Sequence, residues 1–237
     1  MRVLFLDLET TGLKPERSLV WQVAYAKAVQ ESDRVRVLEM VEIVGRECIQ
    51  NRELKQVLEW ADVLVAHNVY FEEEFLSHKG LPVPKESFCT MRRATSVCKI
   101  PNPYYVDDRG NIREWLSPYK RPNLSEAVQV LGLEDHLRAV CRNLTFHDAL
   151  CDVYATIFLY AKLKNLELEF DGYRIRRANS LRKYLTVRQY AVVGKEELLR
   201  SIASQSLLVK VLEKVFNLSE KFRRLKDRWR SEEDLPF

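Results

Sequence analysis

Two acidic residues follow a short apolar segment close to the start of the chain. Residues 3–6 (VLFL) are apolar enough for a central strand, and Asp7 and Glu9 come after them at alternate positions on one strand face. Two carboxylates held side by side at the edge of a core raise each other's pKa and need a cation or strong donors to stay ionised. A hard divalent cation such as Mg²⁺ or Mn²⁺ prefers carboxylate oxygens and meets that need. The alternative is that Asp7 ends the strand while Glu9 is solvated in a turn before Gly12.

A second segment combines an imidazole with a carboxylate. His147 precedes a predicted helix, and Asp152 lies in the first turns of that helix, where unpaired N–H groups favour an anion. The two side chains can converge, but a histidine in this position also serves as a cap or as a surface residue. A zinc site is disfavoured, because Cys141 and Cys151 flank His147 without a Cys-x-x-Cys pair.

Together with a third segment, these residues resemble a known family. Residues 7–13 (DLETTGL), 66–72 (AHNVYFE) and 147–152 (HDALCD) are similar, in order and spacing, to the three motifs of the DnaQ-like 3′-to-5′ exonucleases of the DEDDh group. Residues 89–91 (CTM) and 122–125 (PNLS) resemble that family's strand-to-helix join and the helix before its third motif. The resemblance covers residues 1–164 and implies an α/β, RNase H-like fold, a mixed β-sheet flanked by helices.

The family's roles carry over onto matching positions. The resemblance implies that Asp7, Glu9 and Asp152 ligate two Mg²⁺ or Mn²⁺ ions, with Asp7 bridging both, and that His147 is the general base. It also implies a pocket for the terminal nucleotide, with Leu13 or Phe71 as a wedge against the base. The substrate-binding residues that it implies are Thr10, Thr11, Leu13, His67, Asn68 and Phe71.

One position departs from the family pattern. The second motif normally ends in Asp, whereas this chain has Glu72, whose carboxylate is one methylene longer. Glu72 could still serve the metal after a small shift, or the chain could have kept binding and lost turnover. The resemblance thus implies a 3′-to-5′ exonuclease that releases 5′-mononucleotides from DNA in proofreading or repair. The alternatives are an RNA-trimming exoribonuclease and a non-catalytic nucleic-acid-binding subunit of a polymerase.

The remaining pattern predicts the elements that position these residues. Apolar, β-branched and aromatic runs indicate strands, and repeats at three and four residues indicate helices. Residues 148–163 are expected to present one apolar stripe to the core. Four prolines and a polar cluster indicate a long inserted loop or hairpin over residues 99–122. We predict strands at residues 2–8, 21–29, 35–44 and 63–66, and helices ending near 60 and covering 71–79, 123–132 and 148–163.

Composition places the chain among ordinary globular proteins. Of its 237 residues 46% are hydrophobic and 30% are charged, with 7 Gly and 8 Pro, which argues against a disordered or fibrous chain. No run approaches the roughly 18 uncharged apolar residues of a membrane-spanning helix, and no signal peptide is evident. Because the five cysteines are scattered and odd in number, we expect a reducing, cytoplasmic location.

Positive charge is concentrated in the last third of the chain. Residues 1–164 hold 22 basic and 23 acidic side chains, whereas residues 165–230 hold 16 and 8. We expect residues 165–237 to be a mostly helical accessory segment that binds a polyanion, although the charge could simply solvate surface helices. Residues 234–237 (DLPF) loosely resemble the peptides that grip a sliding clamp; a frayed terminus is the alternative. The predicted phosphate contacts are Arg174, Arg176, Arg177, Arg182, Lys183 and Arg188.

Overall fold

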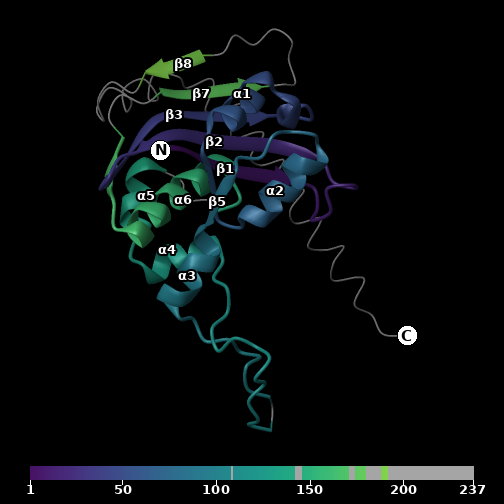
Figure 1. The fold of residues 1–237 in the computed structure, drawn as a ribbon, viewed down its shortest axis with the longest axis vertical. Helices are drawn as coiled ribbons and strands as arrows, with labels where there is room; N and C mark the ends of the chain where they lie inside the picture. Colours follow the sequence, from purple (N-terminus) through teal and green to yellow (C-terminus); the bar gives the residue numbers. More distant parts are fainter. Residues whose placement is uncertain (108, 142–145, 171–173, 180–187, 192–237) are drawn as a thin grey trace, which may run out of the picture. The chain divides into compact units, whose positions relative to one another are not determined.

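A computed structural model describes residues 1–107, 109–141, 146–170, 174–179 and 188–191 (Figure 1). These residues belong to a unit that spans Met1–Ala191. The strands are β1 (Arg2–Thr10), β2 (Val20–Gln30), β3 (Arg34–Val44), β4 (Val63–Ala66), β5 (Glu86–Cys89), β6 (Glu167–Glu169), β7 (Arg174–Asn179) and β8 (Arg188–Ala191). The helices are the 3-10 turn η1 (Cys48–Gln50), α1 (Arg52–Trp60), α2 (Val69–His78), α3 (Thr90–Cys98), α4 (Leu124–Val130), α5 (Glu134–Val140) and α6 (Ala149–Lys164).

Within the described residues the strands form one mixed sheet in the order β5-β4-β1-β2-β3-β7-β8, with β6 also pairing β3. β1, β2 and β3 are antiparallel neighbours, while β4 and β5 run parallel to β1. This order and these directions confirm the expected RNase H-like α/β fold, and they place the carboxyl ends of β1, β4 and β5 at one edge of the sheet. The segments that follow those three ends include the first two motifs.

The sheet continues beyond residue 164. β6 and β7 pair with successive parts of β3, and β8 pairs with β7. The prediction of helix is therefore wrong for these three segments. The physical reason is that the free edge of β3 offers a row of unpaired N–H and C=O groups, which outweighs weak local helix preference. The helices predicted beyond residue 192, the basic residues Arg182 and Lys183 and the tail at 234–237 lie outside the described residues.

Two hydrophobic clusters cover the two faces of the sheet, and β1 contributes alternately to both. Val3 and Phe5 belong to the cluster that packs against α6, whereas Leu4, Leu6 and Leu8 belong to the cluster under α1 and α2. Strand alternation therefore puts Asp7 and Glu9 on the α6 side of the sheet.

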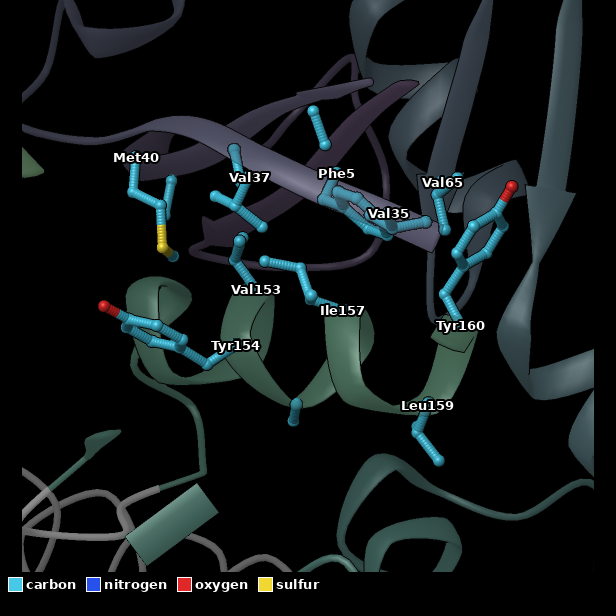
Figure 2. Close-up of a cluster of buried hydrophobic side chains, with 14 of the residues drawn as sticks. Phe5, Val35, Val37, Met40, Val65, Val153, Tyr154, Ile157, Leu159 and Tyr160 are labelled. Atoms are coloured by element: carbon cyan, nitrogen blue, oxygen red, sulfur yellow. The ribbon is translucent and has the colours of Figure 1, made fainter. Parts of the chain in front are cut away.

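Helix α6 is the centre of the first cluster (Figure 2). Val153 and Ile157 point to the sheet, and Tyr160 meets Phe5 edge to face, with 5.3 Å between ring centroids. The prediction of a single apolar stripe is incomplete, because α6 is buried on nearly every side. Helices α3, α4 and α5 pack against its outer surface, which explains why α6 has apolar residues on all of its faces.

Residues 99–122 form the predicted insertion, named here the 99–122 hairpin. Two isolated antiparallel bridges, Pro101 with Tyr119 and Val106 with Ile112, join its two arms. The segment leaves the end of α3 and returns just before α4 (Figure 1).

Candidate metal centre

The third motif lies at the start of α6, where the chain turns sharply. Asp148 is the N-cap, and its side chain accepts a hydrogen bond from the Cys151 N–H at 3.2 Å. His147 adopts a left-handed backbone conformation with φ 74°, which is uncommon for a side chain other than glycine. The backbone N–H of His147 donates to Oδ2 of Asp152 at 3.2 Å, so this carboxylate stabilises the turn that carries the imidazole.

Strand β1 and helix α6 bring the first and third motifs together. One potential ligand atom each from Glu9, His147 and Asp152 lies within 4.8 Å of the others. Asp152 is buried, Glu9 is partly buried and His147 is exposed. The cluster is therefore open to solvent at the imidazole and shielded from solvent at Asp152.

Helix α2 carries Glu72, the residue at which the second motif differs from the family pattern. Glu72 is buried, with 4% of its surface exposed, and its charge is one of those that raise the pKa of Asp7. Glu72 thus acts on Asp7 through its charge, while the ligand atoms that lie within 4.8 Å of one another belong to Glu9, His147 and Asp152.

Two oxygen atoms of this cluster are buried without a partner. Among the described residues, Oε2 of Glu72 and Oδ1 of Asp152 are the buried side-chain oxygens or nitrogens that make no hydrogen bond. Buried polar atoms in folded proteins are nearly always satisfied, by protein, water or an ion. A set of carboxylate oxygens suits a hard cation such as Mg²⁺ or Mn²⁺, so the residues present fit the metals that the sequence predicted.

The pKa values of these carboxylates are all raised. Burial is the first cause for Asp7, whose pKa lies well above its usual range, and the charges of Asp152 and Glu72 add to it. Burial, followed by the charge of Asp152, raises the pKa of Glu9 to about 7. Burial raises the pKa of Asp152 to about 7, against the lowering effect of the His147 N–H, and that of Glu72 to about 8. Keeping the cluster ionised without a cation is therefore costly.

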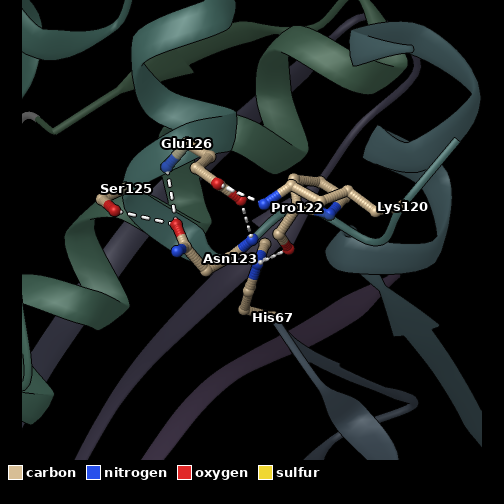
Figure 3. Close-up of polar contacts among 6 residues, drawn as sticks. All are labelled: His67, Lys120, Pro122, Asn123, Ser125 and Glu126. Atoms are coloured by element: carbon tan, nitrogen blue, oxygen red, sulfur yellow. Dashed lines mark hydrogen bonds and ion pairs between the residues drawn. The ribbon is translucent and has the colours of Figure 1, made fainter. Parts of the chain in front are cut away.

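His67 joins the edge of the sheet to the segment before α4 (Figure 3). Nδ1 lies 3.0 Å from Oγ1 of Thr90, and Nε2 lies 3.1 Å from the carbonyl oxygen of Pro122. Burial lowers the pKa of His67 to about 4, so the ring is neutral and Nε2–H donates to the Pro122 carbonyl. Nδ1 is then an acceptor, and it shares the single proton of the Thr90 hydroxyl with the Ala66 carbonyl oxygen, 3.3 Å from that hydroxyl. Because both nitrogens are used internally, this arrangement does not support the expected substrate contact and gives His67 a positioning role.

The start of α4, where the sequence predicted a helix to begin, closes this junction. Asn123 and Glu126 form a reciprocal capping box, and Lys120 pairs with the Glu126 carboxylate (Figure 3). The returning end of the 99–122 hairpin is thereby fixed beside His67.

The loop after β1 places three of the expected substrate-binding residues. The Thr10 hydroxyl donates to the Gly12 carbonyl at 2.7 Å, and Thr11 exchanges two hydrogen bonds with the backbone of Leu19. Leu13, which follows in this loop, is 82% exposed. The threonines thus shape the loop that presents Leu13; their contact with substrate stays a prediction.

The other two expected substrate-binding residues lie at the start of α2. Asn68 is exposed at the N-cap position, and Phe71 is partly buried with its ring 4.7 Å from that of Phe75. Both follow the carboxyl end of β4, so they lie on the edge where β1 carries Asp7. Their role as a nucleotide pocket stays a prediction.

Two features escaped the sequence reasoning. Asp148, which the sequence indicates only as part of a helix start, adds its negative charge to the environment of Asp7 and Glu9. Arg92, in the first turn of α3, lies over the exposed ring of Tyr70 with 5.7 Å from the guanidinium carbon to the ring centroid. No spacing signal links residues 70 and 92; only the parallel pairing of β4 and β5 brings them together.

Comparisons with known proteins give a likeness in structure. No protein-family model matches the sequence, and no curated protein matches it. The structure of E. coli exonuclease I in complex with a dT13 oligonucleotide matches at 18% identity with a TM-score of 0.43, over 68% of this chain and 40% of that one. The complex with dA16 has a TM-score of 0.39 at the same identity and coverage, and a product-bound exonuclease I has 0.43 at 16% identity, over 70% and 43%. This chain thus spans less than half of those proteins, and no functional assignment rests on the likeness.

The described part of the chain contains no helix with the length and apolar character needed to cross a membrane.

Proposed function

We propose that the protein is a metal-dependent 3′-to-5′ exonuclease that releases 5′-mononucleotides from DNA. The observation that carries the proposal is the pair of buried, unpartnered oxygens on Glu72 and Asp152. Asp152 groups with Glu9 and His147 within 4.8 Å, and the charges of Asp152 and Glu72 both raise the pKa of Asp7. A protein that needed these carboxylates only for stability would have paired them with protein donors.

In this proposal Asp7, Glu9, Asp152 and Glu72 are the residues that would hold two divalent cations. When bound, two such ions activate water and stabilise the charge that develops on the phosphate and the leaving oxygen. The exposed imidazole of His147 takes the proton of the attacking water as a general base. Asp152 supports this step by accepting a hydrogen bond from the backbone N–H of His147, which keeps the ring at the solvent-exposed side of the cluster.

Glu72 decides between this proposal and a non-catalytic accessory subunit. One observation favours the enzyme: the Glu72 carboxylate is buried, and its charge raises the pKa of Asp7. Both facts support a Glu72 side chain that points toward the other carboxylates. The exoribonuclease alternative uses the same carboxylates, so it is separated by substrate alone. Roles for a sliding clamp or polymerase, and for residues 165–237 as an accessory segment, stay proposals of the sequence.

The test is incubation of the protein with end-labelled single- and double-stranded DNA and RNA, in Mg²⁺, in Mn²⁺ or in chelator. We expect stepwise shortening from the 3′ end of DNA that requires metal and is absent in the Asp7→Ala variant. Binding without shortening in either metal, by both the wild type and the Glu72→Asp variant, would leave the accessory-subunit reading. Preferential shortening of RNA would establish the exoribonuclease alternative.

A further inference from the structure

The 99–122 hairpin presents large aromatic side chains to solvent. Trp115 is 80% exposed, Tyr104 is 69% exposed and Tyr119 is 37% exposed. Aromatic rings bury a large area when they are packed, so rings left in water on one short segment indicate a surface that meets a ligand.

Backbone pairing holds these rings on an ordered frame. The Asn102 N–H donates to the Pro118 carbonyl at 2.9 Å, and the Lys120 N–H donates to the Ile100 carbonyl at 3.0 Å. Near the tip, Asp107 accepts from the backbone N–H groups of residues 109 and 111. Val106 and Ile112, which are also exposed, face each other across a bridge and belong to this frame. The backbone that carries the rings is therefore ordered by its own hydrogen bonds.

Positive charge is interleaved with the rings. The exposed cationic side chains of Lys99, Arg109 and Arg121 make no ion pair among the described residues. Of the acidic side chains described on this segment, Asp107 is bound within its own turn and Glu114 is exposed next to Trp115. A partner with negative charge and flat apolar groups would complement such a surface; nucleic acid has phosphates and bases.

The frame is connected to the candidate metal centre. Pro122, the last residue of the hairpin, accepts the hydrogen bond of His67, which lies five residues before Glu72. A strand that leaves the carboxylates can therefore continue onto the hairpin without crossing to another edge of the sheet.

Resting on the proposed function, we propose that the 99–122 hairpin binds single-stranded nucleic acid behind the 3′ end under cleavage. Unpaired bases stack on Trp115 and Tyr104, and phosphates contact Arg109 and Arg121. Single strands are the fitting class, because only unpaired bases offer their faces to protein rings, and such stacking tolerates any sequence.

The test measures binding of fluorescent oligonucleotides of about 4 and about 16 nucleotides, the range of single-strand site sizes, to full-length protein in chelator so that no turnover occurs. We expect Trp115→Leu, which keeps an apolar side chain but removes the ring, to weaken binding of the long oligonucleotide by about 5- to 150-fold. Trp115→Phe should retain most of the affinity. Val130→Ala, an exposed apolar change on α4, is the matched control and should bind like wild type.

Charge and length give two further readouts. Replacing both Arg109 and Arg121 with Gln should reduce the slope of log affinity against log salt by roughly 1.4, about 0.7 for each lost phosphate contact. The short oligonucleotide, which occupies only the metal centre, should bind equally well to all variants.

The hairpin proposal would be overturned if Trp115→Leu and the double arginine variant both bound the long oligonucleotide as tightly as wild type. The exposed rings would then indicate a protein partner instead. That result is independent of cleavage in Mg²⁺ or Mn²⁺. If wild type cleaves DNA but the variants bind the long oligonucleotide as tightly as wild type, the hairpin proposal alone fails. If the variants bind it more weakly but wild type cleaves nothing, the proposed function alone fails.

Discussion

Replacing Glu72 with Gln should stabilise the metal-free protein at alkaline pH. The Glu72 carboxyl is buried, and its pKa is raised from 4.5 to about 8, chiefly by burial. A raised pKa means that the folded state holds its proton more tightly than the unfolded state. The stabilisation is complete below the unfolded pKa and is lost as pH rises through the folded one, so it declines between about pH 4.5 and about pH 8. The Glu72→Gln variant has no such proton to lose.

The shift from 4.5 to about 8 sets the size of the effect. At 1.36 kcal/mol for each unit, it corresponds to a loss on the order of 4 to 5 kcal/mol. Water penetration and local relaxation lower the cost of a buried charge, so this figure is an upper bound. Removing the charge also relieves its repulsion of Asp7, which acts in the same direction. We expect the variant to gain about 2 to 4 kcal/mol over wild type on going from about pH 5 to about pH 8.5.

The assay is urea unfolding in chelator at both pH values, with the difference in unfolding free energy taken between pH values so that packing effects of the substitution cancel. Glu74→Gln, an exposed change on the same helix, is the control and should show no pH-dependent gain. Excess Mg²⁺ should shrink or reverse the advantage of Glu72→Gln, because wild type then gains a ligand contact. Parallel pH profiles for Glu72→Gln and wild type would refute the reasoning.

Three further predictions concern single residues. Asp7→Ala should abolish turnover yet raise the melting temperature in chelator, because one of several repelling carboxylates is removed; a lower melting temperature by calorimetry would contradict this. His147→Ala should lower the turnover rate by about 10² to 10⁴, as expected for a general base, with Mn²⁺ affinity nearly unchanged by calorimetric titration; loss of Mn²⁺ binding would make His147 a ligand. His67→Leu should cost about 1 to 3 kcal/mol in urea unfolding, because Pro122 loses its buried donor; a neutral effect would remove its positioning role.

The sequence was informative where local pattern and tertiary structure agree. The short apolar run in β1 predicted the strand, the two-residue period of a strand predicted the shared face of Asp7 and Glu9, and Asn123 predicted the start of α4. Each signal lies within a few residues of what it determines. The α/β, RNase H-like architecture followed from the resemblance, and the strand order confirms it.

The sequence failed where distant segments decide the outcome. β7 forms because β3 has a free edge, a condition that the residues of β7 do not carry. Both ring nitrogens of His67 bind residues far along the chain, so its motif position suggested a ligand contact that the hydrogen bonds do not support. The unpartnered oxygens of Glu72 and Asp152 depend on how α2 and α6 pack, and no spacing could have revealed them.

The most direct test of the proposed hydrolysis is cleavage of a DNA single strand in water enriched in heavy oxygen, with Mn²⁺ present and the released products analysed by mass spectrometry. The proposal predicts 5′-mononucleotides that carry one heavy oxygen in the phosphate, because water attacks phosphorus and the 3′ oxygen leaves. The Asp7→Ala variant should release none. Products with a 3′-phosphate, or bound DNA that stays intact with wild type and with Glu72→Asp alike, would contradict it.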